Sequence, residues 1–376
     1  MLNSLEIKNY RNLKDLKINS LGRVNLITGK NNTGKSTILE AIALYASKGD
    51  LELIYDFLAE RGEYFEKVEY DKDVTDLNTK VLSSLFTNRI VGFEKENTIV
   101  IGSVGNDLFG ETSENSLSIR FVKYLEETHR EKRSLITTKE YILVEENEYQ
   151  GQFKIYKIGI EIKIGINYHI IPIENDRPYR FSFVDKKIYI DCQFIRTGNI
   201  GREINGNLFD AIALTEKEQF VIDALKIIEP TTERIAFIGG NSKERIAVIK
   251  LANIATPLPL KSMGDGVNRI LTIILALVNA QNGFLLIDEF ENGLHYTVQK
   301  KLWKIIFTLA QKLKIQVFVT THSEDCIAGF GRILNDAENK FDGKLIRLDN
   351  INGKIEQVEF DANDLSIATN QNIEIR

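Results

Sequence analysis

The chain has 376 residues, 43% of them hydrophobic and 27% charged, the composition of a soluble protein that can bury a sizeable core. No apolar run reaches the roughly 18 residues of a membrane span, and the start lacks the basic-then-apolar pattern of a signal peptide. Its two cysteines suit a reducing compartment, so we expect a cytoplasmic protein without a membrane partner. The net charge of −5 does not support nucleic-acid binding through the whole surface. A local basic groove stays open, although the best basic cluster, residues 130–133, is short and contains an acid.

Residues 1–28 predict three strands, over 5–8, 13–18 and 22–28. The last of these is an apolar run typical of a buried strand. Arg11 lies between the first two strands. It is either a contact to a nucleotide or an ordinary surface arginine, and the sequence gives both interpretations equal weight.

Residues 29–37 read GKNNTGKST, a complete match to the phosphate-binding pattern G-x-x-x-x-G-K-[ST]. A helix is predicted directly after it, up to residue 46, so the strand, loop and helix that a P-loop needs are all present. Glycines let the loop backbone approach an anion, and its amides converge on phosphate oxygens. The alternative is a Gly/Asn-rich turn before an ordinary helix. The candidate nucleotide-binding residues are Gly29, Asn31, Asn32, Thr33, Gly34, Lys35, Ser36 and Thr37. Lys35 is expected to reach the terminal phosphates, and the Ser36 hydroxyl to ligate Mg²⁺.

The region from 49 to 190 carries no chemical motif. Residues 51–68 predict an amphipathic helix, which Gly62 weakens in its second half. Alternating segments at 98–101, 117–121, 141–144 and 153–164 predict strands. We therefore expect an antiparallel sheet beside the nucleotide core.

The rest of the chain predicts alternating strands and helices. Strands are expected at 188–195, 234–238, 245–249, 283–287 and 315–319, and helices at 216–228, 268–280 and 297–312. The strand at 283–287 ends in Asp288 and Glu289, where a carboxylate of an open α/β sheet would lie beside the P-loop. Asp288 is then placed to hold Mg²⁺ and Glu289 to orient or deprotonate water. Two solvated acids at a strand end are the alternative.

His322 follows the next strand. A helical crossover between parallel strands puts it on the same sheet edge as Asp288, where it can hydrogen-bond a γ-phosphate or the attacking water. A capping or core histidine is the alternative.

These stretches together carry a family likeness. The chain resembles the ABC-type ATPases of the SMC/RecF/OLD group, in particular the compact stand-alone AAA-type ATP-binding proteins grouped with OLD nucleases. The opening LEIKNYRNL resembles the group's first strand and arginine, the SMGDG of 262–266 stands where its signature motif stands, and DEFENGLH is similar to its Walker B and D-loop. His322 takes the place of the switch histidine. The resemblance covers roughly residues 1–48 and 190–345.

The resemblance implies an α/β fold of the ABC-type P-loop NTPases: a mixed central sheet with flanking helices plus an antiparallel β-subdomain. One ATPase domain would span 1–376, with 49–190 inserted in it. It also implies a head-to-tail homodimer or higher oligomer, closed by ATP, in which the signature of one subunit meets the γ-phosphate of the other. The signature residues implied in ATP binding are Ser262, Gly264, Asp265 and Gly266. The usual glycine-rich signature is altered here, and His295 stands where many relatives carry Asp.

The preferred interpretation is a Mg²⁺-dependent ATPase acting as a nucleotide-driven switch, with Glu289, His322 and Lys35 as catalytic residues and Ser36 and Asp288 as metal ligands. The resemblance implies a separately encoded effector, such as a TOPRIM-type nuclease or a toxin. The two proteins would belong to a bacterial anti-phage module, of which the PARIS type is one example. We expect no TOPRIM domain after His322 and therefore no nuclease activity of the chain's own. The main alternative is a RecF/SMC-like DNA-repair ATPase. An ABC transporter subunit and a non-catalytic scaffold are further alternatives.

Overall fold

The computed structural model describes residues 1–63, 74–105, 116–130, 137–144, 156–174, 190–197, 202–239, 245–336, 340–371 and 375. Four predicted features extend beyond these ranges: the end of the helix expected at 51–68, the first residues of the strands expected at 153–164 and 188–195, and most of the basic cluster at 130–133. The described chain divides into two compact units. The first unit comprises 1–3, 18–39 and 190–376, and the second comprises 4–17 and 40–189.

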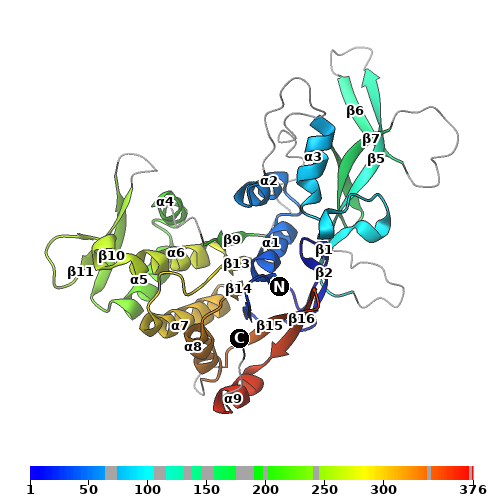
Figure 1. The fold of residues 1–376 in the computed structure, drawn as a ribbon. Helices are drawn as coiled ribbons and strands as arrows, with labels where there is room; N and C mark the ends of the chain where they lie inside the picture. The colour runs from blue at the N-terminus through cyan, green and yellow to red at the C-terminus, as the bar shows by residue number, and fades with distance from the viewer. Residues whose placement is uncertain are drawn as a thin grey trace. The chain divides into compact units, whose positions relative to one another are not determined.

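The first unit is built on a six-stranded sheet in the order β16-β15-β3-β14-β13-β9 (Figure 1). All neighbours are parallel except the hairpin of β15 and β16. The bounds are β3 Val24–Gly29, β9 Cys192–Ile195, β13 Phe284–Ile287, β14 Gln316–Thr320, β15 Gly343–Ile351 and β16 Lys354–Phe360. Strands β3, β13 and β14 are fully buried, as expected for parallel strands covered on both faces.

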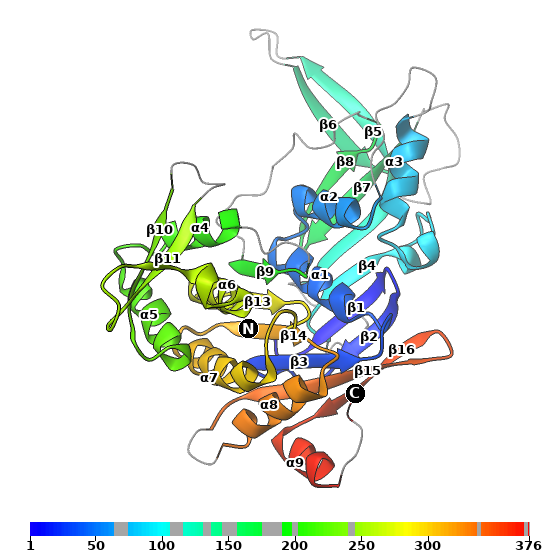
Figure 2. The same ribbon diagram turned by 60° about the vertical axis from the view of Figure 1, so that its left-hand side comes forward.

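Helices flank this sheet and carry most of the apolar core. Helix α5 packs on α6, α6 on α7 and α7 on α8, so that they form a layer (Figure 2). Trp303 on α7 stacks on Phe290 at 4.4 Å between ring centroids and meets Phe330 of α8 edge-on. The helices are α4 Arg202–Asp210, α5 Glu216–Ile228, α6 Asp265–Asn279, α7 Tyr296–Lys312, α8 Glu324–Leu334 and α9 Ala362–Asn370. A small antiparallel sheet beside α5 contains β10 Thr232–Ile238, β11 Ile246–Leu251 and β12 Leu258–Pro259, followed by the 3-10 turn η6 Leu260–Met263.

The second unit holds a seven-stranded sheet, in the order β2-β1-β4-β5-β7-β8 with β6 paired to β5. The predicted antiparallel arrangement is confirmed, because β1–β4, β4–β5, β5–β6, β5–β7 and β7–β8 are all antiparallel. Its strands are β1 Leu5–Tyr10, β2 Leu13–Ile18, β4 Ile99–Gly102, β5 Leu117–Arg130, β6 Thr137–Leu143, β7 Lys157–Ile164 and β8 Asn167–Pro172. The sequence predicted β1 and β2 as strands without naming their partners; in the structure β1 pairs with β4, with Ile7 opposite Ile101.

Helix α1, Lys35–Ala46, begins in the first unit and continues into the second. The second unit also contains α2 Leu51–Glu60, α3 Val74–Ser83 and the short 3-10 turns η1 Thr87–Arg89 and η2 Lys95–Asn97. The helix predicted over 51–68 is too long: α2 ends at Glu60. Gly62, at φ +75°, forms a Schellman cap. In this cap the Gly62 amide donates to the carbonyl oxygen of Ala59, and the Glu63 amide donates to the carbonyl oxygen of Leu58.

Within the described residues, no helix is both long and apolar enough to cross a membrane.

Candidate active site

The loop after β3 has the backbone geometry of a phosphate cradle. Gly29 and Gly34 take φ values of +142° and +89°, which favour glycine, and Asn32 takes +64°. A Cβ on Gly29 would lie 2.4 Å from the carbonyl oxygen of Leu348 on the adjacent strand. The loop then turns directly into α1, whose first residue is Lys35. Only glycine fits where the loop leaves the sheet.

The loop's polar side chains are held locally. Lys35 Nζ donates to the carbonyl oxygens of Gly29 at 2.7 Å and Lys30 at 2.9 Å, and Thr33 Oγ1 donates to Lys30 at 2.8 Å. Asn31 and Asn32 are exposed, whereas Thr33 and Thr37 are buried. The Lys35 ammonium therefore lies over the loop backbone, among the same amides that would contact phosphate oxygens.

Asp288 is the centre of the site, because three hydroxyl groups from three parts of the chain converge on it. Its Oδ1 accepts from Ser36 at 3.0 Å and from Thr320 at 2.6 Å, and its Oδ2 accepts from Thr197 at 3.2 Å. Strands β3, β14 and β13 are parallel neighbours, so their carboxyl ends meet at one edge. The predicted juxtaposition of the P-loop and the Asp288 strand is therefore confirmed. Thr197, which follows β9, belongs to no motif and was missed.

Glu289 lies next to Asp288 in an unusual conformation. Its φ is +48°, and its amide donates to Thr320 Oγ1 at 2.9 Å. Among the described residues, none makes a hydrogen bond or ion pair with its half-buried carboxylate. A non-glycine residue held in the left-handed region costs on the order of 1–3 kcal/mol and is typical of functional turns.

A buried arginine, which was also missed from the sequence, holds the backbone of the turn at Asp288 and Glu289. Arg269 on α6 is 2% exposed. Its Nη2 donates to the carbonyl oxygens of Asp288 at 3.0 Å and Glu289 at 3.2 Å. Burial lowers the pKa of its guanidinium, and the carboxylates of Asp288, Glu289 and Glu291 oppose this change. Arg269 thus connects α6, which starts at the signature-like loop of residues 262–266, to the turn that carries the carboxylates of Asp288 and Glu289.

His322 lies at the same edge, after β14, as predicted. Its Nδ1 is 3.0 Å from Glu291 Oε1, and its amide donates to the same oxygen at 2.9 Å. His322 is exposed. His295, by contrast, is the N-cap of α7 and contacts Thr297, so it has a structural place.

The signature-like loop precedes α6 and is exposed at Ser262 and Gly264. Ser262 Oγ donates to Pro259 at 2.7 Å, and Gly264 takes φ +106° as the N-cap, without a side-chain cap for the helix. A Cβ on Gly266 would lie 2.9 Å from the carbonyl oxygen of Gly293. Asp265 is the first residue of α6.

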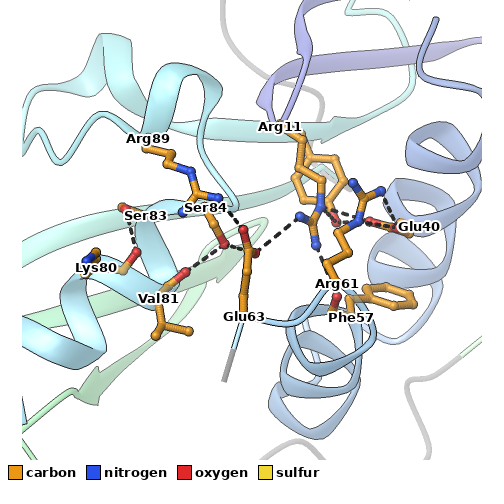
Figure 3. Close-up of polar contacts among 11 residues, drawn as sticks. Arg11, Glu40, Phe57, Arg61, Glu63, Lys80, Val81, Ser83, Ser84 and Arg89 are labelled. Carbon is orange, nitrogen blue, oxygen red and sulfur yellow. Dashed lines mark hydrogen bonds and ion pairs between the residues drawn. The ribbon is translucent and has the colours of Figure 1, made fainter. Parts of the chain in front are cut away.

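Arg11 belongs to the second unit and forms ion pairs with two glutamates of that unit (Figure 3). Its Nε is 2.9 Å from Glu40 Oε2, and its Nη1 is 3.7 Å from Glu63 Oε2. The Arg11 side chain is 6% exposed, so it is not the surface arginine that the sequence allowed. Glu40 also accepts two hydrogen bonds from Arg61 and one from the Tyr10 hydroxyl. A contact from Arg11 to a nucleotide stays a prediction.

A glycine-bearing loop with its lysine, a hydroxyl–carboxylate pair and a glutamate at the carboxyl edge of a parallel sheet define a P-loop nucleoside triphosphatase. Residues 1–327 match the AAA ATPase domain family AAA_15, and the chain belongs to this family. It is an ATPase with a mixed α/β fold.

The chain is similar to an ATP/GTP phosphatase of Helicobacter pylori, at 25% identity over 366 residues, which are 93% of this chain and 92% of that protein. A stretch of 98 residues is 37% identical to an uncharacterised protein of Methanocaldococcus jannaschii, and covers 23% of this chain and 45% of that one. Among solved structures, an SMC head bound to the C-terminal winged-helix domain of ScpA matches with a TM-score of 0.47, 13% identity and coverage of 96% and 97% of the two chains. The SMC head domain of Thermotoga maritima matches with a TM-score of 0.44, 12% identity and coverage of 96% and 99%.

Proposed function

We propose that this ATPase is a Mg²⁺-dependent nucleotide switch that closes into a head-to-tail dimer and controls a separately encoded effector. The observation that carries the catalytic part is the convergence of Lys35, Ser36, Asp288, Glu289 and His322 at one sheet edge within a single unit. The effector part follows from the family resemblance drawn from the sequence.

The donor set fits Mg²⁺. Ser36 Oγ and Asp288 Oδ1 lie 3.0 Å apart, and a hydroxyl with a carboxylate is the hard-oxygen pair that this ion takes in P-loop sites. When bound, the ion neutralises charge on the β- and γ-phosphates. Thr197 and Thr320 fix the Asp288 carboxylate in place by their hydrogen bonds, so the ligand is preorganised.

The remaining groups have distinct roles. Lys35 transfers its hydrogen bonds from the loop carbonyls to the terminal phosphate oxygens, which gain charge in the transition state. The Glu289 carboxylate, which no described residue engages, accepts a proton from the attacking water. His322, at the same edge of the sheet, hydrogen-bonds the γ-phosphate or the attacking water.

The dimer is proposed from the state of the signature-like loop. Residues Ser262 to Gly266 include the N-terminus of α6, which begins at Asp265 and has no side-chain cap, and the amides there can bind an anion. Because Ser262 and Gly264 are exposed, the γ-phosphate of a second copy is the ligand we assign to this loop.

The test uses Glu289→Gln, with Glu324→Gln in the exposed first turn of α8 as matched control. Each protein is purified with its neighbouring gene products and sized with and without ATP. We expect Glu289→Gln to bind ATP, stop turnover and form a larger assembly that retains a second protein, while the control behaves as wild type. ATP hydrolysis by Glu289→Gln at the native rate would refute the catalytic assignment. A dimer that retains DNA instead of a protein would replace the effector switch with the DNA-repair alternative.

Lys35→Ala should abolish ATP binding, because the terminal phosphates lose their cation. Lys30→Ala, an exposed lysine of the same loop, is the control and should retain binding. The measurement is ATP affinity by titration calorimetry, and equal losses in both variants would contradict the role of Lys35.

A further inference from the structure

Glu291 is the third acidic residue after β13, and its contacts point to a role. Its Oε1 accepts from the His322 backbone amide at 2.9 Å and lies 3.0 Å from His322 Nδ1. Its Oε2 accepts from Thr321 Oγ1 at 2.7 Å. The Glu291 side chain is 13% exposed. One carboxylate therefore binds the turn that carries His322 at three points.

These contacts bear on which ring nitrogen carries the proton. An ionised carboxylate offers only lone pairs, so at 3.0 Å the Glu291 oxygen repels a lone pair on Nδ1 of His322 and favours the tautomer that has its proton on Nδ1. In the neutral imidazole the other nitrogen then holds a lone pair. Within the described chain, Nε2 of His322 has no hydrogen-bond partner.

We infer that Glu291 is a positioning residue that fixes His322 as the Nδ1–H tautomer, so that Nε2 of the neutral ring accepts a hydrogen bond from the attacking water and does not donate one to the γ-phosphate. This inference rests on the proposed function for its catalytic meaning. The sequence left two hydrogen-bond partners open for His322, the γ-phosphate and the attacking water. The inference assigns the attacking water.

A simple capping role does not account for the arrangement. Helix α8 already has Ser323 as its N-cap, with Ser323 Oγ accepting from the Cys326 amide at 3.4 Å. Thr321 Oγ1 accepts from the Ser323 amide at 3.0 Å while it donates to Glu291. What Glu291 adds is the close approach of its carboxylate to the ring nitrogen. Carboxylates that orient a functional imidazole commonly act in this way.

The first measurement needs no variant. The chain has four histidines, so long-range ¹H–¹⁵N spectra of the rings can be assigned with His322→Gln. We expect Nδ1 of His322 to show the shift of a protonated nitrogen and Nε2 that of a lone pair at a pH where the ring is neutral. The opposite pattern in the wild-type protein would overturn the inference.

Two variants extend the test. Glu291→Ala removes the acceptor and should give a mixture of tautomers, whereas Glu291→Gln keeps one acceptor oxygen and should remain closer to wild type. Glu140→Ala is the control, because it removes the carboxylate beside the exposed His129 at 3.1 Å and should leave the His322 signals unchanged. Unchanged His322 signals in Glu291→Ala would also overturn the inference.

Kinetics separate this inference from the proposed function. Glu291→Ala should lower kcat roughly several-fold, in step with the active tautomer's share of the mixture, with little change in the KM for ATP. His322→Ala should lower kcat less in Glu291→Ala than in the wild type, because the two residues act through the same ring. If His322→Ala hydrolyses ATP normally, the catalytic role fails, while the ring spectra still decide whether Glu291 fixes the tautomer.

Discussion

Replacing Arg11 by methionine is expected to destabilise the second unit. The Arg11 guanidinium pairs with Glu40 at 2.9 Å, and the two side chains are only 6% and 11% exposed. Removing one partner of a buried ion pair costs about 3–5 kcal/mol, because the other charge is left in a low dielectric. Methionine is unbranched at Cβ, so it suits the left-handed backbone of residue 11, at φ +52°, about as well as arginine does.

The expected cost lies at the lower end, at about 3 kcal/mol, because Glu40 keeps its bonds from Arg61 and the Tyr10 hydroxyl. For units of this size, about 3 kcal/mol corresponds to a fall in Tm of roughly 6–12 °C. Arg61→Met is the matched control. It removes another partner of Glu40, but Arg61 is 39% exposed, so its loss should cost less than about 1 kcal/mol.

The assay is thermal unfolding without nucleotide, followed by ATP titration of both variants. The expected result is a large fall in Tm for Arg11→Met only, with ATP affinity close to wild type. If Arg11→Met unfolds at the wild-type temperature but loses ATP affinity at least tenfold, the buried pair is not what Arg11 contributes. The predicted contact to nucleotide would then be the correct interpretation.

Three further outcomes are expected. Gly331→Ala should stabilise the protein by about 0.5–1 kcal/mol in denaturant unfolding, since a Cβ there meets nothing within 4 Å inside α8; a loss of stability would contradict this. Gly266→Ala should lower ATPase activity, because the added Cβ would lie 2.9 Å from the Gly293 carbonyl and push on the turn after Glu289; wild-type turnover would refute it. Burial raises the pKa of the Cys326 thiol, and its side chain is 0% exposed. Iodoacetamide, which reacts with the thiolate, should therefore not label Cys326 until the protein unfolds; rapid modification of Cys326 in the folded protein, located by peptide mass spectrometry, would be the contrary result.

The sequence predicted those parts of the site that local motifs encode. The P-loop and the Asp288–Glu289 strand end are written in consecutive residues, and the right-handed crossover rule was enough to bring His322 to their edge. The helix over 216–228 was predicted with its observed bounds, because Pro230 marks its end; the structure adds that Thr215 caps its start.

Other parts depend on contacts between distant residues and could not be predicted. Thr197 and Arg269 are single residues outside any pattern, and Glu291, although it lies in the DEFENGLH stretch, was given no role; each acts through a partner at least 20 residues away or on another element. The pairing of β1 with β4 is likewise a non-local choice that strand periodicity does not determine. The end of helix α2, by contrast, is set by a local signal. From the sequence, Gly62 was taken only as a residue that weakens the predicted helix, whereas Gly62 forms the Schellman cap that ends it.

The stacked pair of Trp303 and Phe290 has a practical consequence. The chain contains one tryptophan, and its indole donates to the Cys326 carbonyl at 3.2 Å while its face lies on Phe290. Phe290 directly follows Glu289, and Cys326 lies in the first turn of the helix after His322. The emission of this single fluorophore therefore depends on the packing beside the turns that carry Glu289 and His322, and the unlabelled protein carries its own optical reporter of any movement of these turns.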